Sequence, residues 1–159
     1  MARVLIVGCG CRGRALAREL VAAGHAVRGT TRDPAGAEAI AAAGAEPYVG
    51  DPDRIATLME GVAQTTIVCW LLGSVEDAPE LHGGRLRMLF EKVVDTPVRG
   101  VVYEAAGTAG AEVLEGGRAI ARAAHETWQI PLEILEEDPA DHAAWLAAAS
   151  AAVGRLLTA

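Results

Sequence analysis

The sequence predicts a doubly wound α/β fold, in which a mostly parallel sheet of six strands lies between two layers of helices. Apolar runs of strand length alternate with Ala-rich amphipathic stretches along all 159 residues. The short runs are apolar throughout, which is typical of strands covered on both faces in a parallel sheet. The predicted strands are Arg3–Val7, Ala26–Thr31, Ala45–Val49, Thr65–Leu72, Val98–Tyr103 and Leu132–Leu135. The predicted helices span residues 13–23, 34–43, 53–61, 80–95, 110–127 and 139–157.

Turn residues at the ends of these elements agree with the assignment. Gly24 and Gly44 stand where a helix commonly ends in a residue with positive φ. Asp33-Pro34 and Asp138-Pro139 each offer an N-cap followed by a proline in the first helical turn. Six alternating units predict the strand order 3-2-1-4-5-6. Because no linker or change of composition divides the chain, we expect a single domain over residues 1–159.

Composition and charge narrow the classes of partner. Hydrophobic residues make up 52% of the chain but aromatic residues only 4%, so aliphatic residues and alanine must fill the core. The net charge is −7, and no run of basic residues interrupts the acidic balance. This argues against nucleic acid or an anionic membrane as the main partner. We expect a small-molecule substrate or none.

The cysteines and the N-terminus predict a cytoplasmic protein. Cys9, Cys11 and Cys69 are odd in number and have no framework spacing, which points to a reducing compartment. The apolar run Val4–Val7 is too short for a signal-peptide core or a membrane span. Cys9 and Cys11 form a lone C-x-C, for which small residues filling a tight loop is a simpler interpretation than a redox or metal role. We therefore expect no metal site.

A glycine motif directly after the first strand predicts a nucleotide site. Residues 8–13 read Gly-Cys-Gly-Cys-Arg-Gly, which is a G-x-G-x-x-G at the start of a helix. Gly8 permits a tight turn, Gly10 lets the backbone approach a pyrophosphate, and Gly13 lets the helix pack against the strand. Amides at the helix N-terminus would face the phosphates. A Rossmann-type domain that binds a dinucleotide is therefore expected, and the alternative is an inherited loop that no longer binds one.

The end of the second predicted strand favours NADP over NAD. NAD sites usually carry a carboxylate at this strand tip, which holds the ribose 2′-hydroxyl. Here the tip carries Thr31 and Arg32, and a guanidinium can grip a 2′-phosphate. Arg12 could add a second cation to the same phosphate, whereas Asp33 is better explained as a helix cap. The alternative for Arg32 is an ordinary solvated loop arginine.

The chain resembles the atypical and extended short-chain dehydrogenase/reductases, in particular their epimerase-like and NAD(P)H-binding members. The resemblance rests on Val4–Val7 with the glycine motif, Gly24–Val27, Thr31–Pro34 and Gly50-Asp51-Pro52. The resemblance implies that Asp51, followed by Pro52, contacts the adenine; Asp51 could instead, or in addition, be the N-cap of the helix that runs from Asp53. It also implies that the loop Leu71-Leu72-Gly73-Ser74 runs beside the ribose and pyrophosphate. The residues expected to bind the cofactor are Gly8, Gly10, Cys11, Arg12, Gly13, Thr31, Arg32, Asp51, Pro52, Leu71, Leu72 and Gly73.

The chain departs from that family where the family places its catalytic groups. The resemblance implies a Tyr-x-x-x-Lys pair, in which the tyrosine donates a proton during hydride transfer. Aligned by Glu126, these two positions are arginines, and Tyr103 has no lysine four residues on. We therefore expect this pair, and the family's substrate domain, to be absent. The remaining candidates for a catalytic role, each of which could equally be an ordinary surface group, are Glu104, His82, Arg118 and Arg122.

Two functions remain open at this point. One is an NADP-dependent oxidoreductase of the atypical short-chain type that acts on a small carbonyl, a sugar or an acidic substrate. The other is a non-catalytic NADP-binding sensor or regulatory module, which the missing catalytic pair favours. Rossmann domains host both kinds of protein, so the fold does not decide between them. In either case a second copy of the chain could complete the cleft as a homodimer.

Overall fold

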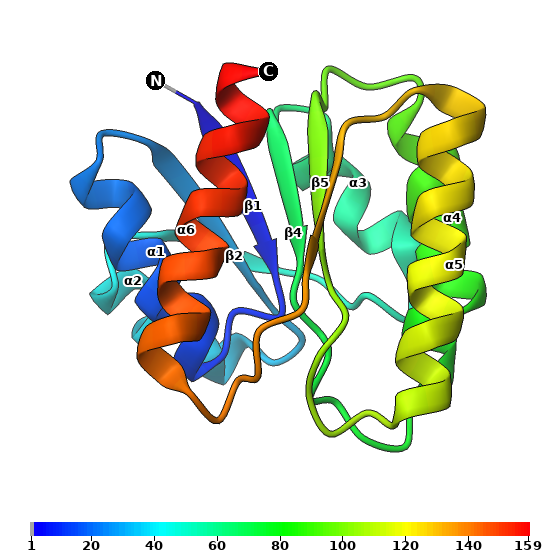
Figure 1. Ribbon diagram of the computed structural model, residues 1–159. Helices are drawn as coiled ribbons and strands as arrows, with labels where there is room; N and C mark the ends of the chain where they lie inside the picture. The colour runs from blue at the N-terminus through cyan, green and yellow to red at the C-terminus, as the bar shows by residue number, and fades with distance from the viewer. Residues whose placement is uncertain (1) are drawn as a thin grey trace.

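The computed structural model describes residues 2–159 and contains one six-stranded sheet (Figure 1). The strand order is β3-β2-β1-β4-β5-β6, and all five neighbouring pairs are parallel, as the sequence predicted. The strands are β1 Arg3–Val7, β2 Ala26–Thr31, β3 Glu46–Val49, β4 Ile67–Trp70, β5 Gly100–Glu104 and β6 Leu132–Leu135.

Helices cover both faces of the sheet, which gives the predicted three layers (Figure 1). The α-helices are α1 Cys11–Ala22, α2 Ala37–Ala42, α3 Met59–Val62, α4 Gly84–Val93, α5 Ala111–Trp128 and α6 His142–Thr158. Three 3₁₀ turns, η1 Pro34–Gly36, η2 Ile55–Leu58 and η3 Pro79–His82, precede α2, α3 and α4. Helices α1, α2 and α6 pack on one face, and α3, α4 and α5 pack on the other. Within residues 2–159 no helix combines the length and apolarity needed to cross a lipid bilayer.

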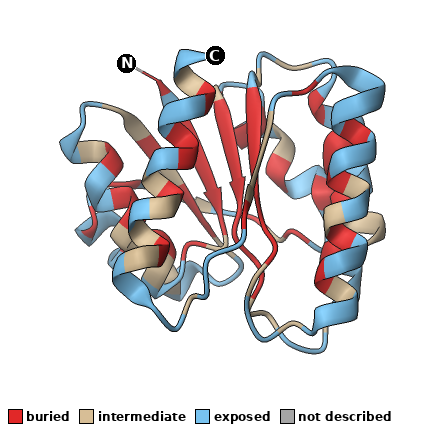
Figure 2. Cartoon of the chain, viewed as in Figure 1, coloured by how far each residue is buried: buried red, intermediate tan, exposed pale blue. Residues whose placement is uncertain are grey.

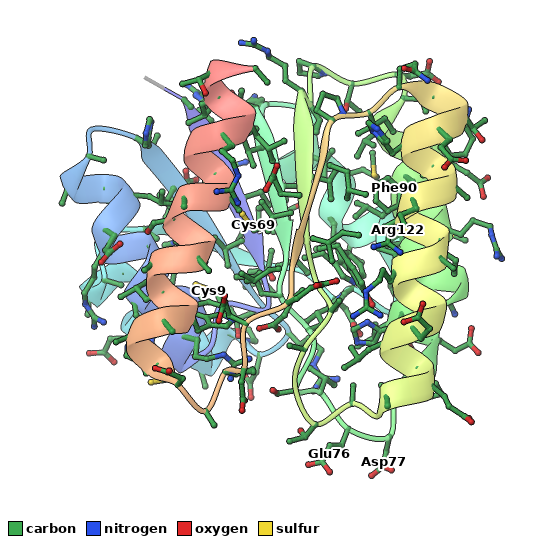
Figure 3. All side chains as sticks on the ribbon, in the orientation of Figure 1. Cys9, Cys69, Glu76, Asp77, Phe90 and Arg122 are labelled. Atoms are coloured by element: carbon green, nitrogen blue, oxygen red, sulfur yellow. The ribbon has the colours of Figure 1, made fainter. Side chains whose placement is uncertain are left out.

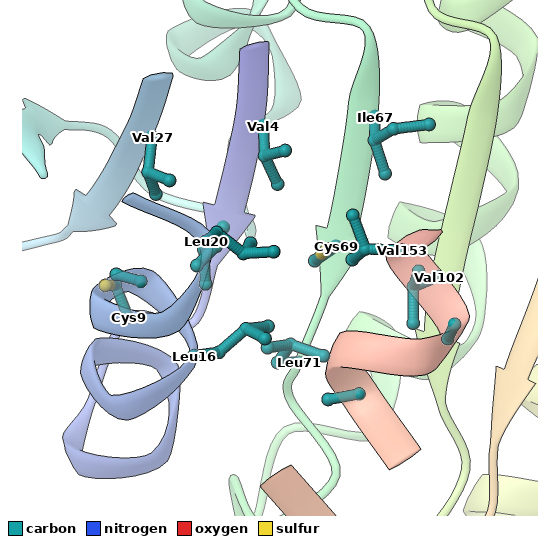
Figure 4. Packing of buried hydrophobic residues seen from close by; sticks show 14 of the residues in the cluster. Val4, Cys9, Leu16, Leu20, Val27, Ile67, Cys69, Leu71, Val102 and Val153 are labelled. Atoms are coloured by element: carbon teal, nitrogen blue, oxygen red, sulfur yellow. The ribbon is translucent and has the colours of Figure 1, made fainter. Parts of the chain in front are cut away.

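The core consists of two apolar layers, one on each face of the sheet (Figure 2). Leu16 and Leu20 of α1 meet Cys69 of β4 and Val153 of α6 in the first layer (Figure 4). Aliphatic side chains dominate both layers, as the low aromatic content requires. The largest buried side chains are nevertheless Trp70, Trp145, Tyr103 and Phe90.

Several predicted boundaries are wrong, and each has a local cause. The fourth strand ends at Trp70, so Leu71 and Leu72 leave the sheet and line the space beyond its edge. The expected helix 80–95 divides into η3 and α4, because Gly83 adopts φ −124° and ψ −113°, outside the helical region. Asp138 accepts a bond from Ala140 N, but the N-cap of the last helix is Asp141, whose side chain accepts from Ala144 N at 3.2 Å.

Other turn assignments are confirmed. Gly24 and Gly44 have φ of +94° and +88°, in the region that only glycine adopts without strain. The Asp33 carboxylate accepts a hydrogen bond from Ala35 N at 2.9 Å and so caps η1, as expected. Asp33 is therefore occupied locally at the tip of β2.

Helix α5 approaches the sheet closely at Gly117. A Cβ atom at this position would collide with the hydroxyl of Tyr103 and would lie 2.6 Å from the Cζ atom of its ring. Tyr103 is fully buried on β5, so its ring has no room to move aside. At Gly116, the preceding residue, an added Cβ would meet no atom within 4 Å.

We therefore expect opposite effects from alanine at these two adjacent positions. Gly117→Ala should lower the free energy of unfolding by about 1–3 kcal/mol, since it overpacks the core. Gly116→Ala should raise it by about 0.5–1 kcal/mol, because glycine is unfavourable inside a helix and this site is open. Urea unfolding of both variants tests the pair, and a Gly117→Ala protein as stable as the parent would contradict the packing of Tyr103.

Candidate functional site

A cavity of about 700 Å³ lies at the carboxyl ends of β1, β2 and β4. Segments from five places in the chain form its wall: the glycine loop, the tip of β2, residues 36–40 of η1 and α2, residues 51–53, and the segment after β4 through η3. The predicted cofactor residues that line it are Gly8, Gly10, Cys11, Arg12, Gly13, Thr31, Arg32, Asp51, Pro52, Leu71 and Leu72. Gly73 is not part of the lining, since it donates its N–H to the buried Glu104.

The three motif glycines have different physical roles. Gly8 has φ +90°, and a Cβ there would collide with the Leu71 carbonyl. At Gly13 a Cβ would lie 2.8 Å from the Gly8 carbonyl oxygen, so this glycine allows α1 to approach β1. Gly10 has φ −82°, and an added Cβ would meet nothing within 4 Å. The turn and the packing therefore require Gly8 and Gly13, whereas Gly10 faces open space in the cavity.

At the tip of β2, the Arg32 guanidinium lines the cavity, whereas the neighbouring Asp33 carboxylate does not. The Thr31 hydroxyl donates to the Asp33 carbonyl at 2.8 Å, and the Asp33 carboxylate caps η1. Arg32 is exposed and lines the cavity together with Thr31. The charged group available to a ligand at this strand tip is therefore positive.

Glu104, at the end of β5, is fully buried and does not face the cavity as a catalytic group would. Its Oε1 accepts from Gly73 N at 2.8 Å, and its Oε2 accepts from Trp145 Nε1 at 2.7 Å. The Arg12 guanidinium pairs with the same carboxylate at 3.4 Å. A buried carboxylate needs such partners, because burial without them costs several kcal/mol. Glu104 therefore binds protein groups and is not free for substrate.

Arg12 does not join Arg32, so this part of the sequence prediction is wrong. Its guanidinium reaches Glu104 on β5 and lies 5.3 Å from the centre of the Trp145 ring. In the sheet, β5 and β2 lie on opposite sides of β1. The Arg12 side chain is thus directed away from the tip of β2, although its residue still lines the cavity.

His82 is also buried and bonded at both ring nitrogens, contrary to its expected place facing a substrate. Nε2 lies 3.0 Å from the Leu72 carbonyl, which can only accept, so Nε2 carries the proton. Nδ1 then accepts from the Tyr103 hydroxyl at 2.7 Å. Burial lowers the pKa of His82 below its ordinary value of 6.5, and the bond to Leu72 opposes this only in part. Burial likewise raises the pKa of Tyr103.

Arg118 and Arg122 do not line the cavity either. Arg118 forms ion pairs with Glu115 and with Glu136, the second at 3.0 Å, and donates to the Ala105 carbonyl. It therefore ties α5 to the chain beyond β5 and β6. Arg122 is exposed farther along α5 (Figure 3). The placement of these arginines beside a cofactor, which rested on alignment by a single glutamate, is not what the structure shows.

The cysteines of the loop differ in exposure. The Cys9 sulfur packs over β2, where a Cβ on Gly29 would lie only 2.6 Å from it. Burial raises the pKa of Cys9 to about 11, with a smaller opposing effect from Arg14. A thiol with this pKa is not reactive at neutral pH, which agrees with a space-filling role. Cys11 is exposed and lines the cavity.

Sequence reasoning missed several members of the site. Arg14, Glu80 and Leu81 line the cavity but were not predicted to do so, whereas Ser74, which also lines it, belongs to the loop that was expected beside the cofactor. Arg14 follows Gly13 directly, so its place in the first turn of α1 was a usable signal. The 3₁₀ turn η3 has no recognisable motif. Its attachment to the sheet depends on Trp70, whose Nε1 donates to the Leu81 carbonyl at 2.9 Å.

Comparison with known proteins supports the architecture. The model of the TrkA-N domain family matches residues 4–79. An uncharacterised protein of Schizosaccharomyces pombe is 40% identical over 63 residues, which are 39% of this chain and 21% of that protein. The chain therefore spans about a fifth of that relative.

Solved structures resemble a larger part of the chain. A short-chain dehydrogenase/reductase superfamily protein of Agrobacterium tumefaciens with bound NAD superposes with a TM-score of 0.68 at 18% identity, covering 84% of this chain and 48% of that one. Triphenylmethane reductase of Citrobacter sp., complexed with NADP(H), superposes with a TM-score of 0.65 at 19% identity. This match covers 85% of this chain and 49% of the reductase. The chain has a Rossmann-type fold. It spans about half the length of these structures.

The buried state of His82 predicts a pH dependence of stability. Because burial lowers its pKa in the folded protein, the unfolded chain binds a proton more readily. The contribution of the neutral ring is complete above the unfolded-state pKa of about 6.5 and decreases as the pH falls below it, by at most about 1.4 kcal/mol per pH unit. His82→Gln should have a lower free energy of unfolding than the parent at pH 8. Its free energy of unfolding should also decrease less steeply than that of the parent between pH about 6.5 and 5.

Urea unfolding at several pH values measures this slope. His142 is exposed, so His142→Gln is the matched control and should keep the slope of the parent. An unchanged slope in His82→Gln would show that the buried imidazole does not cause the pH dependence.

Proposed function

We propose that this chain binds a nicotinamide dinucleotide in the cavity, and NADP in preference to NAD. The observation that carries the proposal is the convergence of the glycine loop, the β2 tip, residues 51–53 and the loop after β4 on one cavity. Parallel α/β sheets bind nucleotides at this edge, where the direction of strand order reverses, which here lies between β1 and β4.

The residues present fit such a ligand. Gly10 leaves open space beside the N-terminus of α1, which a pyrophosphate could approach. Asp51 and Pro52 line the half of the cavity near β2, where the resemblance expects the adenine. Structures with the same fold are described with bound NAD or NADP(H), and the TrkA-N family is a nucleotide-binding family of Rossmann type.

The preference for NADP rests on the charge at the tip of β2. Arg32 lines the cavity there, and the nearby Asp33 carboxylate is held by Ala35 N. A guanidinium forms charge-assisted hydrogen bonds with a phosphate, whereas a carboxylate at the same place would repel it.

An oxidoreductase activity is the chemistry that a bound nicotinamide would supply as a hydride carrier. Its substrate would be a small carbonyl, a sugar or an acid. A specific observation favours the second candidate, a non-catalytic sensor or regulatory module. His82, Glu104, Arg118 and Arg122 all lie outside the cavity lining, so none of these candidates reaches the ligand as a proton donor. Consumption of NADPH in the presence of a carbonyl panel distinguishes the two, and the module predicts negligible turnover.

Gly10→Val tests the binding site. The parent φ of −82° is open to any residue and the space is free, so the variant should fold normally. Its side chain would occupy the space of the pyrophosphate, and we expect the affinity for NADPH and for NADH to fall by at least about 30-fold. Calorimetric titration measures both. Gly154→Ala, in open space on α6, is the control and should bind as the parent does. A Gly10→Val protein that binds as tightly as the parent would place the ligand elsewhere.

Arg32→Ala tests the choice of cofactor. Loss of one charge-assisted contact should weaken NADPH binding by about 10- to 100-fold, while NADH binding should change by less than about twofold. Equal losses for the two cofactors, or none for either, would remove the reason to prefer NADP.

A further inference from the structure

Two arginines flank the first turn of α1 and lie on opposite sides of it. Arg12 and Arg14 are two residues apart, and each helical residue advances by about 100°, so their side chains are separated by about 200° around the helix axis. The residues between these directions that face the sheet are Gly13, Leu16, Ala17 and Leu20, all of them buried. One arginine therefore lies toward each neighbour of α1 on the sheet.

Contacts of the side chains identify which neighbour each arginine faces. Arg12 reaches Glu104 and Ser74, on the side of β4, β5 and α6. Arg14 must then lie on the side of β2. A second observation agrees, since Arg14 donates to the Cys9 carbonyl at 3.5 Å and its charge acts on the Cys9 thiol, lowering its pKa against the larger effect of burial. That thiol packs over Gly29 of β2.

Arg14 and Arg32 line the same cavity from α1 and from the tip of β2. Within residues 2–159 neither forms an ion pair, whereas Arg12 is paired with Glu104. Of the acids beside the β2 end of the site, Asp33 caps η1, Asp51 accepts from Asp53 N, and Asp53 pairs with Arg85. Asp77 and Glu80 line the cavity from the segment after β4. Two arginines without an ion pair thus line one cavity, from the β2 side of α1 and from the tip of β2, in a chain whose net charge is −7. Such an arrangement is suited to a compact dianion.

We propose that Arg14 acts with Arg32 to bind the 2′-phosphate of NADP(H), and so is a specificity-determining residue that replaces the role expected of Arg12. The proposal rests on the proposed function, because it assigns one phosphate of the same ligand. The phosphate would lie beside Thr31, between the two guanidinium groups, and each would donate charge-assisted hydrogen bonds to it. Arg12 instead neutralises the buried Glu104.

Titration with four probes tests the assignment. NADPH and 2′,5′-ADP carry the 2′-phosphate, and NADH and 5′-ADP lack it. Arg14→Gln should weaken the two phosphorylated probes by about 10- to 100-fold and change the other two by less than about twofold. Arg14→Lys keeps the charge and should retain an intermediate affinity. Arg14→Gln combined with Arg32→Gln should abolish the preference for NADPH over NADH.

Two control variants separate this effect from general damage. Arg18 is exposed one turn farther along α1 and does not line the cavity, so Arg18→Gln should bind all four probes as the parent does. Arg12→Gln should lower the melting temperature, because it leaves Glu104 without its cation, and should not weaken the phosphorylated probes selectively.

The outcomes that overturn the proposal differ from those that overturn the proposed function. Parallel losses of NADPH and NADH in Arg14→Gln would place Arg14 on the pyrophosphate and contradict the 2′-phosphate assignment. An unchanged NADPH affinity in Arg14→Gln, or a selective loss in Arg12→Gln, would also contradict it. A parent protein that binds NADPH and NADH equally would end this proposal and the preference for NADP, but not the dinucleotide site. One that binds neither would end the proposed function as a whole.

Discussion

The site depends on one buried charge, the carboxylate of Glu104. Its three donors come from the loop after β4, from α6 and from the first turn of α1, which lie 31, 41 and 92 residues away in the sequence. A carboxylate removed from water is stable only while such partners remain, so the contacts are mutually dependent. The arrangement fixes the loop after β4 beside the glycine loop, and both form walls of the cavity. It also commits Arg12 to a protein contact, which leaves Arg14 and Arg32 as the unpaired arginines near β2.

A second set of buried hydrogen bonds, made by His82 and Trp70, holds the other side of the segment after β4. His82 bonds Leu72 and Tyr103, while Trp70 bonds Leu81. Together they attach η3 to β4 and β5, and Gly117 gives the Tyr103 ring the space that it needs under α5. Groups that resemble acid–base candidates in the sequence thus stabilise the wall of the site. This distribution of polar groups favours ligand binding over proton transfer by these residues.

The sequence was sufficient to predict those features that depend on residues close together in the chain. Continuous apolar runs predicted all six strands, and the spacing of Gly8, Gly10 and Gly13 predicted the loop and the cavity beside it. It failed where a residue's role depends on a partner far along the chain. Glu104 at a strand end resembles a group that faces substrate, because nothing nearby in sequence reveals Trp145 as its donor. The direction of Arg12 likewise depends on which flank of α1 faces β5, which is a property of the packed helix.

Dinucleotide binding in this cavity is tested most directly by an amide NMR titration of the parent protein with NADPH. Binding in this cavity predicts saturable shifts, with one ligand per chain, for the amides of residues 8–14, 30–33, 51, 53 and 71–75, which form or adjoin the cavity wall. Amides near the groove between α4 and α5, such as those of Ala123 and Thr127, should not respond. Shifts confined to that groove, or no saturable shift at all, would contradict the assignment of this cavity as a dinucleotide site.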